Sequence, residues 1–282
     1  MKEKIAFWPA WFLDSLPEKD KRRLKPAILK QLKLSQIYLW RALNIYDDFW
    51  DGAGQAKKLN LANSYQRRYF KIIYSLGLAR DYHYLFDRVW TALEKANQAE
   101  MAQPRLKIME GKIFFPGRWP EFKKLENLSR KSLVLALAPL AIMYLQEKPP
   151  NRKRVLGALN FFRFALAAKQ LADDAQDWLS DLKSGALTSV NLLLLKKAKR
   201  GGLSLDWKRR PEVLDQLFVR EASLKISQQL MDLCAQARQA AWQAAWKNNC
   251  SLIREIIEPL ENGVKEVEKF RSLLAKKPKK MI

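Results

Sequence analysis

The sequence predicts an all-α protein, and two observations support this prediction. Helix-favouring residues such as Leu, Ala, Lys, Gln and Arg are abundant in the 282-residue chain, whereas Val is sparse and Thr occurs only at Thr91 and Thr188. Gly and Pro lie mostly between the stretches with helical apolar periodicity, where they end helices. We expect one large helical domain over residues 1–282, with a frayed basic tail at about 276–282.

Recognisable boundary residues mark several of the predicted helices. The first helix is expected to begin at Pro26, because proline suits the first turn, and to end at Asp51 before Gly52 and Gly54. Further helices are expected at about residues 61–78, 82–101, 122–146, 152–183, 192–199, 211–247 and 251–274. The segment 104–120 is expected to form a loop, and Gly185 is expected to end the helix over 152–183.

The charge of the chain is strongly positive, because 52 Lys and Arg face 29 Asp and Glu, a net charge of +23. A basic surface attracts nucleic acid, anionic membrane or phosphorylated substrates. Charge alone does not choose among these partners, and a solvated lysine-rich surface is an equally good explanation. Peripheral contact with an anionic membrane is compatible with this positive charge. A homodimer is also compatible with the sequence.

Several classes of protein are excluded or disfavoured. Cys234 and Cys250 are too few for a disulfide framework or a cysteine zinc site, and the single histidine, His83, disfavours a histidine-based site. No glycine-rich phosphate-binding or dinucleotide-binding motif and no nucleophile-elbow motif occurs. The N-terminus lacks the apolar core of a signal peptide, and the longest apolar run, 133–145, is shorter than the ~20 residues needed to span a bilayer. We therefore expect a cytoplasmic protein.

Two aspartate clusters carry the functional prediction. Asp47-Asp48-Phe49-Trp50-Asp51 and Asp173-Asp174-Ala175-Gln176-Asp177 repeat the pattern D-D-x-x-D, 126 residues apart. On a helix, the first and last carboxylates of this pattern lie one turn apart on one face. Such like charges repel and require a counter-charge, and Mg²⁺ commonly bridges a few carboxylates to substrate phosphates. Two such faces across a helical bundle would hold magnesium around one diphosphate.

The clusters and their flanking residues resemble the aspartate-rich motifs of the trans-isoprenyl diphosphate synthases (polyprenyl synthetases). Gln170 fits the family pattern F-Q-x-x-D-D-x-x-D, Lys131-Ser132 is similar to its Lys-Thr pair, and Asp181 and Gly185 continue in its manner. The resemblance covers about residues 26–188. It implies the isoprenoid synthase fold, a helical bundle with a central active-site cavity, and a magnesium-dependent condensation of an allylic diphosphate with isopentenyl diphosphate to a longer isoprenyl diphosphate.

The resemblance also implies a role for individual residues. The magnesium ligands would be Asp47, Asp51, Asp173 and Asp177, with Asp48 and Asp174 binding directly or through water. The isoprenyl diphosphate substrates would be held by Lys57, Lys58, Lys131, Gln170, Lys183, Arg22, Arg23 and Lys25. The hydrocarbon chain would lie in an apolar pocket near Leu43, Leu135, Phe161, Phe164 and Leu166. In the family the product chain grows past the residues just before the first cluster, and Ala42 and Leu43 there are not bulky aromatics, which favours a pocket that is open beyond a short product.

The sequence departs from the family at three places. Lys169 replaces the aromatic residue of the second motif, and Lys57-Lys58 stand where the family has an arginine pair, which loses the planar fork that grips phosphate. The segment Arg22–Pro26 is similar to the basic segment that binds the homoallylic diphosphate, but it lacks the glycines and lies closer to Asp47. Either the N-terminal part is reduced by about one helix, or this segment is a coincidental basic turn.

Three other functions remain open on the sequence. A class I terpene cyclase shares the fold and the first motif, but it usually has a different second metal motif. A head-to-head squalene or phytoene synthase fits the spacing of Asp173, Asp177, Asp181 and Gly185. A non-catalytic basic helical subunit would explain the charge, but the acidic clusters would repel nucleic acid, so we expect no specific nucleic-acid binding.

Overall fold

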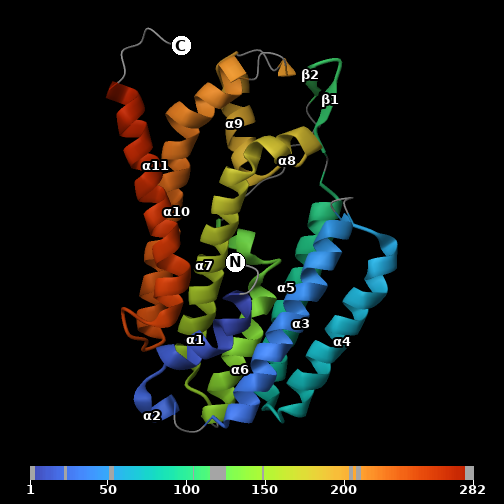
Figure 1. Cartoon of the computed structure of the whole chain (residues 1–282), viewed down its shortest axis with the longest axis vertical. Helices are drawn as coiled ribbons and strands as arrows, with labels where there is room; N and C mark the ends of the chain where they lie inside the picture. Colours follow the sequence, from blue (N-terminus) through green and yellow to red (C-terminus); the bar gives the residue numbers. More distant parts are fainter. Residues whose placement is uncertain are drawn as a thin grey trace. The chain divides into compact units, whose positions relative to one another are not determined.

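The computed structural model describes residues 4–21, 24–50, 54–103, 105–114, 125–147, 149–202, 206–207 and 211–276. These residues are almost entirely helical, which confirms the predicted all-α class (Figure 1). The chain divides into two compact units, described separately below. Unit 1 comprises Met1–Met101, Arg130–Arg163 and Ala237–Ile256, and unit 2 comprises Ala102–Ser129, Phe164–Gln236 and Ile257–Ile282. The single domain expected from the sequence stays a prediction.

The elements of unit 1 are η1 (Lys4–Phe7), α1 (Trp8–Ser15), α2 (Glu18–Lys21), α3 (Pro26–Trp50), η2 (Ala56–Lys58), α4 (Leu59–Ser75), α5 (Arg80–Met101), η4 (Leu133–Ala136) and α6 (Leu137–Gln146). Those of unit 2 are β1 (Lys107–Met109), β2 (Lys112–Phe114), η3 (Leu125–Ser129), α8 (Trp178–Ser184), α9 (Ser189–Arg200), η6 (Pro211–Asp215), η7 (Phe218–Ala222) and α11 (Glu258–Lys276). Three helices have residues in both units: α7 (Arg152–Gln176), α10 (Ser223–Gln243) and η8 (Ile253–Ile257).

Short helices precede Pro26, where the sequence predicted none. Their buried residues Ile5, Trp8, Phe12 and Leu16 follow one another at intervals of three or four, so one face of η1 and α1 enters the core. The ring of Phe12 meets that of Trp246 edge to face, with 5.3 Å between centroids. The N-terminal segment therefore packs on the last part of unit 1 in sequence.

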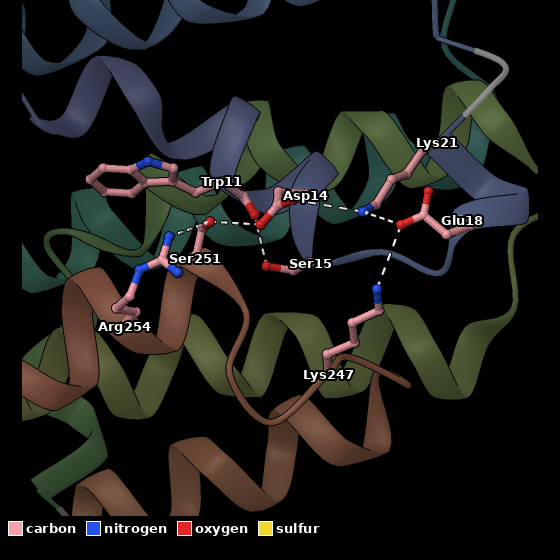
Figure 2. A network of polar contacts seen from close by, with 8 residues as sticks. All are labelled: Trp11, Asp14, Ser15, Glu18, Lys21, Lys247, Ser251 and Arg254. Carbon is pink, nitrogen blue, oxygen red and sulfur yellow. Dashed lines mark hydrogen bonds and ion pairs between the residues drawn. The ribbon is translucent and has the colours of Figure 1, made fainter.

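A polar network fastens the same two parts of the chain (Figure 2). Ser251 donates a hydrogen bond to Asp14 over 2.6 Å, which is the main reason why the pKa of Asp14 lies below its usual value. Glu18 lies 2.8 Å from Lys21 and 3.5 Å from Lys247. Ser251 is buried, but the charged groups of the network are at least partly exposed, so their ion pairs add a modest stabilisation that salt weakens.

Helix α3 is the central helix of unit 1 and packs along α4 (Figure 1). Its buried face includes Leu32, Gln36 and Leu39, and the Gln36 side-chain amide donates to the carbonyl of Leu135 over 2.9 Å. The residues of η4 and nearly all of those of α6 are buried. Helix α3 therefore packs against η4 and α6 as well as against α4.

Two helices predicted as continuous are interrupted. The helix expected over 122–146 is divided into η3, η4 and α6 within the described residues, and the helix expected over 152–183 breaks at Asp177, between α7 and α8. Gly185 ends α8 as predicted, with a left-handed φ of 84°. Inside the segment expected to be a loop, β1 and β2 pair in an antiparallel hairpin around Glu110 and Gly111.

No helix in the described part of the chain is long and apolar enough to cross a membrane.

Candidate functional site

The first aspartate cluster lies in the last turn of α3, where Asp47 and Asp48 are exposed. Asp51 lies outside the described residues. The C-terminal end of a helix carries partial negative charge from its unpaired carbonyl groups, so carboxylates there are unfavourable without a cation. Asp173 occupies the same kind of place in the last turn of α7. Both clusters therefore lie where a positive partner is most needed.

Lys131 supplies that partner for the first cluster. Its Nζ atom lies 2.8 Å from Oδ1 of Asp47 and 2.6 Å from Oε2 of Glu100 on α5. Burial opposes the charge of Lys131, but the two carboxylates outweigh it and raise its pKa above the usual 10.5. The structure thus brings together two predicted site residues, Asp47 and Lys131, and adds Glu100, which no motif indicated.

Gly54 lies close to the last turn of α3. The backbone N–H of Gly54 donates to the carbonyl of Asp48 over 2.6 Å, and a Cβ atom at Gly54 would lie only 2.5 Å from the Cα of Phe49. Only glycine fits this close approach without a shift of the backbone. Lys57 and Lys58 follow in η2, and both are exposed. Their predicted contact with a diphosphate stays a prediction.

Lys25 lies at the opposite end of α3 from Asp47. It directly precedes Pro26, the first residue of the helix, and is exposed. With a rise of 1.5 Å per residue, the backbones of Lys25 and Asp47 are about 33 Å apart along the axis. Lys25 therefore does not lie beside the first cluster, and its predicted contact with a second diphosphate stays a prediction. Arg22 and Arg23 lie outside the described residues.

The second cluster, in unit 2, has a lysine of its own. Lys169 forms an ion pair with Asp173 one helical turn later on α7. Asp177 lies at the junction of α7 and α8, and its backbone N–H donates to the carbonyl of Asp173 over 2.9 Å. The two residues are therefore one turn apart, as the spacing predicted, although the helix breaks there. Lys169, which departs from the family pattern, acts as a counter-ion.

Asp174 is the buried member of the second cluster, with 6% of its surface exposed. Its Oδ1 accepts a hydrogen bond from the Gln170 amide and its Oδ2 accepts one from the Ser189 hydroxyl, both over 2.9 Å. Burial raises the pKa of Asp174 and outweighs the two hydrogen bonds, which lower it. Gln170, predicted to touch the diphosphate, thus has its amide nitrogen bonded to Asp174, and Ser189 is an addition from α9.

Asp174→Asn should therefore raise the melting temperature at pH 7. A carboxyl group whose pKa is higher in the folded than in the unfolded state contributes stability below its usual pKa of 3.8, and this contribution is lost as the pH rises through the folded-state pKa. At neutral pH the buried charge costs stability, which asparagine removes. Thermal unfolding of both proteins at pH 7 and pH 3 measures this, and the difference should shrink at pH 3.

The matched control is Asp173→Asn, because Asp173 is more exposed and is paired with Lys169. It should leave the melting temperature nearly unchanged at both pH values, since exposed ion pairs contribute little. A lower melting temperature for Asp174→Asn at pH 7 would mean that the charge of Asp174 stabilises the fold.

A cavity of about 530 Å³ opens beside the second cluster in unit 2. It is lined by Asp177, Lys183, Gln176, Leu179, Ser180 and Trp207. The structure thus places Asp177 and Lys183, a predicted metal ligand and a predicted diphosphate ligand, on the wall of one cavity. Trp207 was not predicted, because it comes from a distant segment that has no recognisable motif.

The apolar residues proposed for the hydrocarbon pocket fall into different surroundings. Phe161 is fully buried and packs edge to face on Trp246, with centroids 4.9 Å apart, so it belongs to the aromatic core of unit 1. Leu135 is buried in the same unit, and Leu43 is half-buried. Phe164 and Leu166 belong to unit 2. A pocket formed by these residues stays a prediction.

The aspartates suit a magnesium ion that is bound partly by protein carboxylates and partly by a substrate phosphate. Within the described residues, no group of three or more Asp, Glu, His or Cys side chains could hold a metal ion by itself. Asp47 and Asp173 each have a lysine partner, and both oxygens of Asp174 accept hydrogen bonds. Magnesium commonly takes only one or two protein carboxylates and completes its shell with water and substrate phosphate. The residues present suit that arrangement.

A comparison with solved structures identifies the fold. The structure is similar to that of the geranylgeranyl pyrophosphate synthetase from the archaeon Geoglobus acetivorans, with a TM-score of 0.60 and 14% sequence identity, over 94% of this chain and 84% of that one. No model of a protein family matches the chain, and no curated protein sequence does. At this identity the similarity concerns the fold, so the chain has the isoprenoid synthase fold.

Proposed function

We propose that this protein is a magnesium-dependent prenyltransferase, which ionises an allylic prenyl diphosphate and joins its hydrocarbon to isopentenyl diphosphate. The observation that supports this most is the occurrence of two D-D-x-x-D clusters, each in or next to the last turn of a helix, on an isoprenoid synthase fold. A structural protein has no need for six clustered carboxylates in a chain of net charge +23.

The chemistry requires that a diphosphate leave an allylic carbon, and this needs positive charge around the leaving group. Magnesium bound with the substrate would supply most of that charge. Asp47, Asp48, Asp173 and Asp177 would hold the ions from the protein side. Lys131 and Lys183 would donate hydrogen bonds to the phosphate oxygens.

Lys131 and Lys169 would also have a role before the substrate binds. In the absence of metal, each lysine neutralises one carboxylate, which reduces the repulsion between the carboxylates of its cluster. Asp47 and Asp173 would hold metal ions that bind with the diphosphate, and Lys131 and Lys169 would then be able to donate hydrogen bonds to phosphate oxygens. The protein would thus exchange one set of ion pairs for another rather than expose bare charges.

A second candidate function is ionisation without elongation, as in a terpene cyclase or a head-to-head synthase. The position of Lys25 favours it, because elongation needs a second diphosphate next to the first, and Lys25 lies about 33 Å along α3 from Asp47. If the chain elongates, the isopentenyl diphosphate must be held by other basic residues, and Lys57 and Lys58 are the first basic residues after the first cluster.

The test is to incubate the protein with magnesium and an allylic diphosphate, with and without isopentenyl diphosphate, and to identify the products. Elongation predicts longer prenyl diphosphates that form only when both substrates are present. Lys25→Ala should leave this reaction unchanged, whereas Lys57→Ala with Lys58→Ala should slow it at least tenfold at low isopentenyl diphosphate. Hydrocarbon or alcohol from the allylic substrate alone would favour the second candidate, and no turnover of any allylic diphosphate would contradict both.

A further inference from the structure

Unit 2 contains a second cavity that shares no lining residue with the one at Asp177. It has a volume of about 220 Å³ and lies between α9 and α10, with α7 behind it. Ser189, Leu193 and Lys196 line it from α9 at positions i, i+4 and i+7, so one face of that helix forms a wall. Ile226 and Lys225 line it from α10.

The walls of this cavity are aliphatic and its charged lining groups are all positive. Leu171, Val190, Leu192 and Ile226 are buried, each with 4% or less of its surface exposed. Lys196 and Lys225 are exposed. Among the described residues no carboxylate lines the cavity, and neither lysine has an acidic partner.

The volume sets the size of the apolar part of a ligand. A cavity of about 150 Å³ holds benzene, with its six carbons, so 220 Å³ accommodates roughly eight. The two lysines match a negatively charged head group, since an ammonium group donates hydrogen bonds to phosphate. An apolar cavity alone or a pair of surface lysines alone would be ordinary, and it is their combination that selects an amphiphile.

We propose that this cavity binds a single-chain amphiphile with about eight carbons in its buried part and a phosphate head group between Lys196 and Lys225. The ligand would lie against Ser189, whose hydroxyl is 2.9 Å from Asp174 of the second cluster. Its hydrocarbon could be a straight lipid-type chain or a branched isoprenoid chain, since the aliphatic walls accept both.

Binding is measured by calorimetric titration of the whole protein with octyl phosphate, in low salt and in the presence of a chelator. The chelator keeps magnesium from holding the phosphate at the aspartate clusters, so the result does not depend on the proposed enzymatic function. Low salt preserves the attraction between lysine and phosphate. We expect one saturable site, with octanol and inorganic phosphate each binding at least tenfold more weakly than octyl phosphate.

Two pairs of variants locate the site. Lys196→Ala with Lys225→Ala should weaken binding of octyl phosphate at least tenfold, whereas Arg200→Ala, the removal of a charge from α9 outside the cavity, should change it less than twofold. Gln229→Glu adds a negative charge to the cavity wall and should also weaken binding, while Gln239→Glu on the same helix, away from the cavity, should not.

Leu193→Trp fills the cavity from a half-exposed position and should abolish binding, with the helical circular dichroism spectrum as the check on folding. Titration with geranyl phosphate then distinguishes the two kinds of hydrocarbon chain. Tighter binding of geranyl phosphate would identify an isoprenoid ligand, and tighter binding of octyl phosphate would identify a straight-chain lipid. Equal binding of octanol and octyl phosphate, or binding that survives Leu193→Trp and the double lysine substitution, would overturn the proposal.

Discussion

Asp47→Asn and Asp173→Asn should each lower the turnover of an allylic diphosphate by about 10²–10³-fold, the usual cost of removing one electrostatic contact to the developing charge. Asparagine has nearly the shape of aspartate but lacks its charge, so it cannot hold a metal ion with the same strength. The released diphosphate is measured with a coupled pyrophosphate assay at saturating magnesium. Both variants should keep the helical spectrum of the wild type.

The control for this experiment is Asp87→Asn, which removes an equal charge from an exposed position on α5. It should keep the rate of the wild type within a factor of two. Activity near that of the wild type in either cluster variant would contradict the metal role of that cluster. If the rate of a variant rose to the wild-type rate when more magnesium was added, the carboxylate would only tighten metal binding.

Gly185→Ala should lower the stability of unit 2 by roughly 2–4 kcal/mol, because the position has two demands that alanine cannot meet. Its φ of 84° is a left-handed conformation, which costs a residue with a side chain about 1–2 kcal/mol. In addition, a Cβ atom there would lie 2.5 Å from the carbonyl oxygen of Leu106, whose own N–H donates to the Gly185 carbonyl over 2.9 Å. Thermal unfolding followed by circular dichroism measures the loss.

Two other glycines of unit 2 separate these demands. Gly202 has a φ of 63° but no described atom within 4 Å of a Cβ, so Gly202→Ala should cost only the conformational strain, about 1 kcal/mol. Gly263 lies inside α11 with free space and no positive φ, and Gly263→Ala should stabilise the helix slightly. If Gly185→Ala and Gly202→Ala were equally destabilising, the approach to Leu106 would have no energetic importance.

Helix boundaries marked by a residue with a special backbone could be predicted from the sequence. Pro26 begins α3 and Gly185 ends α8, since the missing N–H of proline and the left-handed φ of glycine fit few other places. The break at Asp177 could not be predicted, because the helical pattern of apolar residues continues through it. The change from the 3₁₀-helix η4 to the α-helix α6 was also missed, since nearly all of these residues are buried and give no periodicity.

Two short elements were missed although the sequence contains a signal for them. Glu110 and Gly111 form a two-residue turn with positive φ values of 50° and 77°, between strands in which Ile108 and Ile113 are paired. The buried positions of η1 and α1 follow a helical spacing, but the segment is short, and Pro9 within it and Pro17 after it make it resemble a loop.

The candidate site was predictable where charge is clustered in the sequence, and not where a partner comes from a distant element. The six aspartates and Lys131 were recognised by their motifs. Glu100, Ser189 and Trp207 were not, because each stands alone in the sequence and reaches the site only through the fold. Lys25 precedes the first residue of α3 and Asp47 lies in its last turn, so the two are far apart along the helix, which their separation in the sequence did not indicate.

Pyrophosphate binding at increasing magnesium tests most directly whether both clusters serve one metal–diphosphate complex. We expect no binding of pyrophosphate by calorimetry in the presence of a chelator, and saturable binding when magnesium is added. Asp47→Asn and Asp173→Asn should each weaken this binding at least tenfold, although the residues lie in different units of the chain. Binding that is equally tight without magnesium, or that depends on one cluster and is indifferent to the other, would contradict the proposal of a shared magnesium–diphosphate site.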